Sequence, residues 1–265
     1  MSCKRLVLPT IVSYKPLAGG SRTMTVRHRN LTVDWLGYAT ARLESIAGTV
    51  VYTDPGRYGV LEGQYPKDGH LVVVTHGDHY DSDGIERVAR QDATVVVFEG
   101  VDADRIDREV RPVDELPYEV VRCSDDEYLT VDLETDGGPT TVDIWTLPAY
   151  NRPDGPCADA DGNVPHPEGE GCGFRLAVDG TTVFWPGDTD ALDGLAELEV
   201  SLLLANIGGG VVMDRHAAAD LAERMDPDLV VPIHYDTFDL LAADDEAFAA
   251  DVASRSVPVA LDRPE

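Results

Sequence analysis

The stretch Thr75-His76-Gly77-Asp78-His79-Tyr80-Asp81 follows directly on an apolar run at residues 71–74. Two histidines and two aspartates fall within six positions here, in a chain that has only seven histidines. A buried strand that ends and delivers imidazole and carboxylate groups into one loop is typical of a divalent-metal site. Each of these side chains alone would also fit a solvated loop, but their concentration favours metal binding.

Three later side chains fit the same kind of site. Asp188 follows an apolar strand predicted at residues 182–185, His234 follows another predicted strand, and His166 lies in a Gly/Pro/Asp-rich loop at residues 151–171. Strand ends on one rim of a two-sheet sandwich converge, so these side chains can share a metal with the first cluster. The competing interpretations are a helix cap for Asp188, a hydrogen-bonded rim histidine for His234 and an ordinary loop residue for His166.

The charge of the chain excludes some partners. It carries 49 Asp and Glu against 21 Lys and Arg, a formal net charge of −28, and the acidic residues are spread along the whole length. An acidic patch for a basic partner would cluster them instead. We therefore expect a surface adapted to high intracellular salt, in a halophile. Nucleic acid is not expected as a partner, because nothing here would neutralise phosphates.

Apolar runs and cysteines bear on the location of the protein. No run is long enough to span a membrane, and the N-terminus lacks the pattern of a secretory signal. The four cysteines are scattered, with no C-x-x-C pair. We therefore expect reduced thiols in a cytoplasmic protein that binds no membrane.

The order of predicted elements indicates the fold class. Strands are predicted at residues 31–36, 41–46, 49–53, 71–75, 94–98, 118–122, 128–131, 140–147, 173–178, 182–185, 200–205, 229–232 and 257–261. Helices are predicted at residues 82–91, with Ser82 as N-cap, and at 190–198, 214–225 and 244–254. Many strands followed by alternating helices predict an α/β sandwich of two sheets with helices outside. We expect a single domain over residues 1–265, with a loosely docked arm over residues 1–30.

Several motifs occur in a fixed order along residues 31–240. They are Trp35-Leu36-Gly37-Tyr38-Ala39-Thr40, Thr53-Asp54-Pro55, the His76 cluster, Pro148-Ala149-Tyr150-Asn151, the segment at 166–174, Gly187-Asp188-Thr189-Asp190 and His234-Tyr235. In this order they resemble the metallo-β-lactamase superfamily, closest to the branch that includes L-ascorbate-6-phosphate lactonase-like proteins. The resemblance implies a four-layer αββα sandwich with its site at the rim between the sheets. This branch often has Gly-His where this chain has Gly37-Tyr38.

The family's His-x-His-x-Asp-His pattern is altered in this chain, and two alignments are open. If Gly77 is an insertion, Asp81 is the motif's aspartate and Ser82 stands in the place of its last histidine. If residues 76–79 are the second half of the motif, Asp78 is the aspartate and the first histidine is missing. Either way one ligand is lost or replaced by a carboxylate.

The resemblance also implies roles for individual residues. The implied metal ligands are His76, His79, Asp81, His166, Asp188 and His234, with Asp188 as the bridge between two ions. Asp81, or Asp78 in the other alignment, would ligate the second ion and help to orient the attacking water. The histidines favour Zn²⁺, in one or two copies, whereas the carboxylates leave Mn²⁺ or Fe²⁺ open.

We expect a metal-dependent hydrolase that uses a metal-activated water on a small ester, lactone or phosphoester. Asn151 and Tyr235 are candidate substrate contacts, with a buried loop anchor as the competing interpretation. The alternative function is a catalytically reduced metal-binding or scaffold protein on the same fold, which the altered cluster favours. The substrate and the oligomeric state stay open, a homo-oligomer included.

Overall fold

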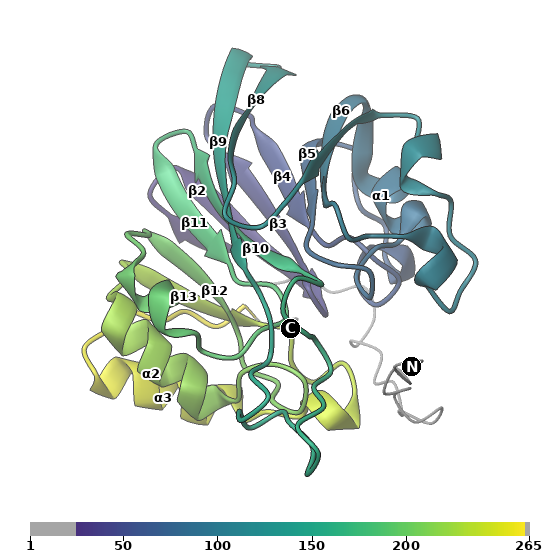
Figure 1. Ribbon diagram of the computed structural model, residues 1–265. Coiled ribbons are helices and arrows are strands. Elements are labelled where there is room, and N and C mark those ends of the chain that lie inside the picture. The colour runs from purple at the N-terminus through teal and green to yellow at the C-terminus, as the bar shows by residue number, and fades with distance from the viewer. Residues whose placement is uncertain (1–24, 263–265) are drawn as a thin grey trace.

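The structure of the protein is a computed structural model that describes residues 25–262. Its strands form a seven-stranded and a six-stranded sheet that pack against each other (Figure 1). The first sheet has the order β1-β2-β3-β4-β5-β6-β7, and its strands are β1 (Val26–His28), β2 (Leu31–Gly37), β3 (Thr40–Ser45), β4 (Val50–Thr53), β5 (Gly69–Val74), β6 (Ala89–Phe98) and β7 (Glu119–Cys123). The second has the order β13-β12-β11-β10-β9-β8, and its strands are β8 (Tyr128–Thr135), β9 (Gly138–Pro148), β10 (Cys172–Val178), β11 (Thr181–Trp185), β12 (Leu202–Asn206) and β13 (Leu229–Ile233).

Both sheets combine an antiparallel half with a parallel half. Strands β1 to β4 pair antiparallel, and β4 to β7 pair parallel. In the second sheet β8 to β11 pair antiparallel, and β11 to β13 pair parallel. In the parallel halves, several strands therefore have their carboxyl ends at the same edge of the sheet. The loops that follow these strands can bring side chains together there.

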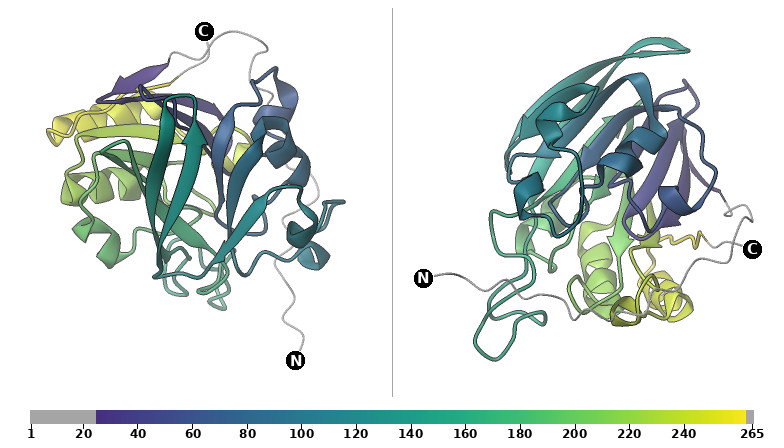
Figure 2. Two further views of the ribbon diagram at one scale, coloured as in Figure 1. Left: turned by 90° about the horizontal axis from the view of Figure 1, so that it is seen from above. Right: turned by 90° about the vertical axis from the view of Figure 1, so that its right-hand side faces the viewer.

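Helices lie outside both sheets. Helix α1 (Ser82–Val88) lies outside the first sheet, and α2 (Arg215–Met225) and α3 (Asp245–Ser254) lie outside the second (Figures 1 and 2). This arrangement confirms the predicted α/β sandwich of two sheets with helices outside. Short 3₁₀ turns complete the list: η1 (Val60–Glu62), η2 (Ala103–Arg105), η3 (Val113–Glu115), η4 (Asp193–Glu197) and η5 (Asp239–Leu241). Within residues 25–262 no helix is both long and apolar enough to cross a membrane.

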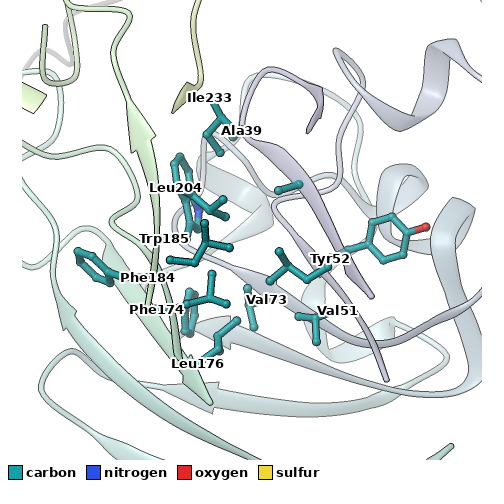
Figure 3. Close-up of a cluster of buried hydrophobic side chains, with 14 of the residues drawn as sticks. Ala39, Val51, Tyr52, Val73, Phe174, Leu176, Phe184, Trp185, Leu204 and Ile233 are labelled. Atoms are coloured by element: carbon teal, nitrogen blue, oxygen red, sulfur yellow. The ribbon is translucent and has the colours of Figure 1, made fainter. Parts of the chain in front are cut away.

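The core between the sheets follows the two-residue alternation of strands. Val73 of β5 and Trp185 of β11 point toward each other from the two sheets, whereas Tyr52 and Phe184 point to the outer faces (Figure 3). All four side chains are fully buried, because helices and loops cover the outer faces as well. The indole of Trp185 is thereby placed at the inner end of the rim where β5 and β11 finish.

Helix α1 differs from its prediction at both ends. Its N-cap is Asp81 rather than Ser82, because Asp81 Oδ1 accepts the backbone N–H groups of Asp83 and Gly84 at 3.1 and 3.0 Å. The helix ends at Val88 instead of residue 91, because the next residues already belong to β6. Asp81, which was predicted as a metal ligand, thus caps the N-terminus of a helix.

The helix predicted at residues 190–198 is wrong. The structure has only the 3₁₀ turn η4 there. Leu192 stands at its N-cap and offers no side-chain acceptor, and Gly194 inside the segment weakens a helix further.

Two other predicted segments differ in part. The strand predicted at residues 257–261 is reduced to a single bridge between Val230 and Val259. Within the arm predicted at residues 1–30, β1 pairs with β2, and residues 1–24 lie outside the described residues. The remaining predicted strands and helices are confirmed, with ends shifted by a few residues.

Candidate metal centre

Acidic and histidine side chains meet at one rim of the sandwich, each shortly after a strand. Asp54 follows β4, His76 and His79 follow β5, Asp188 follows β11 and His234 follows β13. Neighbouring parallel strands run in the same direction, so their carboxyl ends open onto the same edge. The predicted convergence of the strand-end residues is thus present in the structure.

His166 reaches the same rim on the long loop between β9 and β10. The loop is tied down at both ends, because His76 forms an isolated bridge with Gly171 and Asn151 N–H donates to His166 O at 2.8 Å. The rings of His76 and His166 are 5.0 Å apart between centroids. A loop residue that could have been solvated is therefore part of the site.

Asp188 lies at the centre of two groups of donor atoms. Its Oδ2 is 3.8 Å from His76 Nε2 and 3.4 Å from His166 Nε2, and the three residues form the first donor group. Its Oδ1 is 3.6 Å from His79 Nε2 and 3.3 Å from His234 Nε2, and these residues form the second donor group. Within each group the ligand atoms lie within 4.8 Å of one another. One carboxylate therefore presents one oxygen to each pair of imidazoles.

The protonation of the site suits metal binding. Burial lowers the pKa of His76, His79 and His234 well below the ordinary value, and neighbouring imidazoles lower it further. Burial also raises the pKa of Asp188 well above its ordinary value, and the charge of Asp54 adds to the effect. Neutral imidazoles offer the lone pairs that metals bind, and a divalent cation would hold Asp188 in its ionised form.

Several buried side-chain atoms that could bind a metal have no hydrogen-bond partner within the described residues. They include Nε2 of His76 and Oδ1 of Asp188. The Nε2 atoms of His79 and His234 face each other at 3.3 Å, so two lone pairs meet unless a cation or a proton lies between them. A cation in each donor group would satisfy these atoms, so the residues present fit a pair of metal ions.

Hydrogen bonds on the far side of three of the four rings fix which nitrogen faces Asp188, whereas Nδ1 of His234 has no hydrogen-bond partner within residues 25–262. His76 Nδ1 is 2.9 Å from Thr75 Oγ1, His166 Nδ1 is 3.1 Å from Val211 O, and His79 Nδ1 is 3.0 Å from Asp54 Oδ2. Each Nδ1–H donates outward, which leaves Nε2 unprotonated and directed into the site.

Asp54 was not predicted as a site residue, although its motif was noted. Its Oδ2 accepts hydrogen bonds from Trp185 Nε1 at 2.7 Å and from Thr75 Oγ1 at 2.8 Å, and its Oδ1 accepts from Thr75 N at 2.8 Å. Like His76, Asp54 is a polar residue directly after an apolar strand. That signal could have identified it from the sequence.

The two aspartates of the segment at residues 75–81 lie in different surroundings. Asp81 is outside both donor groups, and its Oδ1 caps α1. Asp78 is half-exposed and its Oδ2 lies 3.9 Å from His166 Nε2, beside the first donor group. The structure therefore places Asp78 beside the first donor group, whereas the aspartate was predicted to ligate the second ion.

The two predicted substrate contacts lie in other surroundings. Asn151 is fully buried, and its amide donates to Asp190 Oδ1 and Val211 O while its Oδ1 accepts from His166 N–H at 3.1 Å. Asn151 thus anchors the loop of His166, which was the competing interpretation. The ring of Tyr235 stacks on Trp35 with centroids 4.5 Å apart.

A small cavity opens beside the first donor group. Its volume is about 30 Å³, which is room for about two water molecules, and it is lined by His76, Gly77, Asp78, Gly100, Asp102, Arg105, Ile106, Ala149, Pro165, His166, Glu170, Gly171 and Asp188. Arg105 and Glu170 form an ion pair at 3.1 Å among these lining residues.

Comparisons with known proteins agree with this fold. The sequence profile of the β-lactamase superfamily domain matches residues 32–234. A UPF0173 metal-dependent hydrolase from Thermococcus kodakarensis is 29% identical over 242 residues, which are 86% of this chain and 95% of that protein. Another from Pyrococcus furiosus is 30% identical over 208 residues, 74% of this chain and 79% of that protein. The solved structure of a metallo hydrolase from Ignicoccus hospitalis matches with a TM-score of 0.65 and 20% identity, over 88% of this chain and 95% of that one.

Proposed function

The chain belongs to the β-lactamase superfamily and its UPF0173 family of metal-dependent hydrolases, and from this premise we propose that it hydrolyses a small neutral ester or lactone. The observation that carries the proposal is the central position of Asp188. Its two carboxylate oxygens each face a pair of imidazole Nε2 atoms. This is the donor arrangement that a pair of metal ions sharing one carboxylate requires.

The residues that would hold the metals follow from the two donor groups. His76 and His166 would bind the first ion, His79 and His234 the second, and Asp188 both. When bound, such ions lower the pKa of a shared water and polarise the oxygen of the substrate. The four imidazoles favour zinc, and a further carboxylate would shift the preference toward manganese or iron.

Asp78 is the best candidate for an additional donor to the first ion. Its Oδ2 is 3.9 Å from His166 Nε2, and its charge acts on Asp188 as well. In this arrangement a carboxylate stands in for the missing histidine of the family's pattern. Asp78 would also help to orient the attacking water, the role that the sequence left open between Asp78 and Asp81.

The charges around the cavity favour neutral substrates over phosphoesters. The carboxylates of Asp78, Asp102 and Glu170 line the cavity, and among the lining residues within 25–262 the one Lys or Arg is Arg105, which is paired with Glu170. A phosphate dianion would approach these carboxylates at a cost, whereas a neutral ester or lactone would not.

Charge also supports a proposal about the source and setting of the protein. Its net charge of −28 is spread along the chain, as a surface that must stay hydrated at high salt would require. We place the protein in the cytoplasm of a halophile, as a single domain that acts on a small molecule. The four cysteines without a C-x-x-C pair support a reducing compartment.

The test is metal content per chain, by elemental analysis on protein kept in molar salt. The wild type is expected to hold two zinc ions, His79→Ala one, and Asp188→Ala none. His216→Ala, at an exposed histidine outside both donor groups, is the matched control and should keep both ions. No metal in a folded wild-type protein would sink the hydrolase reaction and leave a scaffold on the same fold.

Activity on model substrates tests the substrate class. The zinc-loaded protein should hydrolyse 4-nitrophenyl acetate faster than 4-nitrophenyl phosphate, because the lining carboxylates repel the dianion. The reverse order would contradict the preference for neutral substrates while leaving the metal site intact.

A further inference from the structure

Tyr38 occupies a strained position next to the second donor group. It lies in the turn between β2 and β3 with a φ of +50°, a left-handed conformation that residues other than glycine seldom adopt. Its carbonyl oxygen accepts hydrogen bonds from Trp35 Nε1 at 2.8 Å and from His234 N at 3.0 Å. The backbone of Tyr38 is therefore tied directly to the backbone that carries His234.

The ring of Tyr38 packs on both histidines of the second donor group. Its centroid is 4.5 Å from that of His234, with the rings tilted by 34°, and 5.0 Å from that of His79 in an edge contact. Tyr58 and Phe238 hold the ring with edge contacts at 5.7 and 5.6 Å. Four rings thus fix its position, and a side chain that is fixed in advance can act without reorganising.

The hydroxyl of Tyr38 is available for a ligand. Within residues 25–262 no group lies within hydrogen-bond distance of it, and the side chain is only partly buried. Because the ring centroid lies 4.5 Å from that of His234 and 5.0 Å from that of His79, the hydroxyl at the end of this ring lies close to the second donor group. A phenol oxygen carries one O–H donor, and within residues 25–262 that donor has no acceptor.

We propose that the Tyr38 hydroxyl donates a hydrogen bond to the substrate oxygen that becomes negative during hydrolysis. The inference rests on the proposed function, because that oxygen is the carbonyl oxygen of an ester or lactone. As water adds to the carbonyl carbon, negative charge develops on this oxygen, and a fixed donor stabilises the charge more than it stabilises the neutral carbonyl. Tyr38 keeps its proton throughout, so the step needs no further acid or base.

The decisive variant is Tyr38→Phe, which removes the hydroxyl and keeps the ring on both histidines. Zinc content should stay at the wild-type value, because the hydroxyl belongs to neither donor group. With 4-nitrophenyl acetate, kcat should fall about 100-fold while KM changes little, since loss of one such donor acts on the transition state. The matched control is Tyr128→Phe on β8, whose hydroxyl donates to Asp143 at 2.7 Å and whose loss should leave kcat unchanged.

A binding measurement separates this inference from the proposed function. Inorganic phosphate is a tetrahedral anion, and its Kd for the zinc-loaded protein, from calorimetry, should rise about 10-fold in Tyr38→Phe. If no ester is hydrolysed but phosphate binding weakens in this way, the proposed function fails, while the Tyr38 hydroxyl is still a donor to an anion bound at the metals. If kcat and phosphate Kd match the wild type, or if Tyr38→Phe loses zinc, the inference about Tyr38 is overturned.

Discussion

The Nδ1 atom of His79 lies 3.0 Å from Oδ2 of Asp54, and both side chains are completely buried. Because Nδ1 donates its proton to Asp54, Nε2 of His79 keeps a lone pair that faces Asp188. Trp185 and Thr75 also donate to Asp54 and hold its carboxylate in place. Asp54 belongs to neither donor group, yet it determines which nitrogen of His79 is free to bind a metal.

Asp54→Asn should weaken the second metal site. The N–H₂ group of the amide would oppose either Thr75 N–H or the donors at Oδ2, which include His79 Nδ1–H, so the support of His79 is weakened. We expect zinc in the second donor group to bind about 10- to 100-fold more weakly, with the first group little changed. Zinc titration against a competing chelator measures this. Asp245→Asn, a similar change on α3, should leave both affinities intact, and unchanged affinities in Asp54→Asn would contradict the role assigned to Asp54.

Much of the fold could be predicted from the pattern of apolar residues. The strands around His76 and Asp188 are short apolar runs that end in polar residues, and both lie where the sequence placed them. The helix predicted over residues 190–198 failed because acidic residues near a strand end resemble a helix start even where no cap forms. Local signals therefore identified strands better than the ends and existence of short helices.

The partners of the metal ligands could be predicted less well than the ligands. Trp185 and Thr75 are ordinary strand-end residues in the sequence, and only the packing of the two sheets brings them to Asp54. Tyr38 likewise lies far from His79 and His234 along the chain. Contacts between distant segments depend on the register and packing of both sheets, and no local pattern encodes them.

Asn151→Ala should loosen the loop that carries His166. The substitution leaves the buried His166 N–H without its acceptor and removes both donors of the amide. We expect the free energy of unfolding to fall by about 1–3 kcal/mol and zinc in the first donor group to bind more weakly. Denaturant melts and zinc titration check both effects. Asn163→Ala, at a residue of the same loop that bonds to Asp159, is the control, and an equal loss of zinc affinity there would contradict the anchoring role.

Asp262 should make stability fall as the pH rises. Burial raises the pKa of Asp262 from its ordinary 3.8 to about 7, and the charge of Asp34 adds to the shift. A raised pKa in the folded state means that this contribution is full below pH 3.8 and is lost as the pH rises through about 7. Asp262→Asn should therefore be more stable than the wild type at about pH 8, by about 1 kcal/mol or more, and no more stable at low pH.

The comparison for Asp262 uses chemical unfolding at both pH values with the same zinc concentration. Asp228→Asn, at an exposed residue paired with Arg29, should show no such change with pH. Equal stabilities of Asp262→Asn and the wild type at both pH values would mean that folding does not raise the pKa of this carboxyl.

The excess of acidic residues should make the protein more stable in salt. Its net charge of −28 makes the folded chain repel itself, and salt screens that repulsion. We expect the free energy of unfolding to rise steadily when KCl is increased from about 0.1 M to about 2 M. Replacing Glu by Gln at several exposed positions should flatten this rise. A stability that is independent of KCl would remove the support for a halophilic source.

Asp78 and Asp81 should respond differently to the same substitution. Asp78→Ala removes a carboxylate 3.9 Å from His166 Nε2, so we expect zinc in the first donor group to bind more weakly at little cost in stability. Asp81→Ala removes the acceptor of two backbone N–H groups at the start of α1, so it should cost about 1 kcal/mol of stability and leave zinc affinity intact. Zinc titration and denaturant melts on both variants decide the matter. If Asp81→Ala loses zinc and Asp78→Ala does not, the first alignment is correct and Asp81 is the ligand.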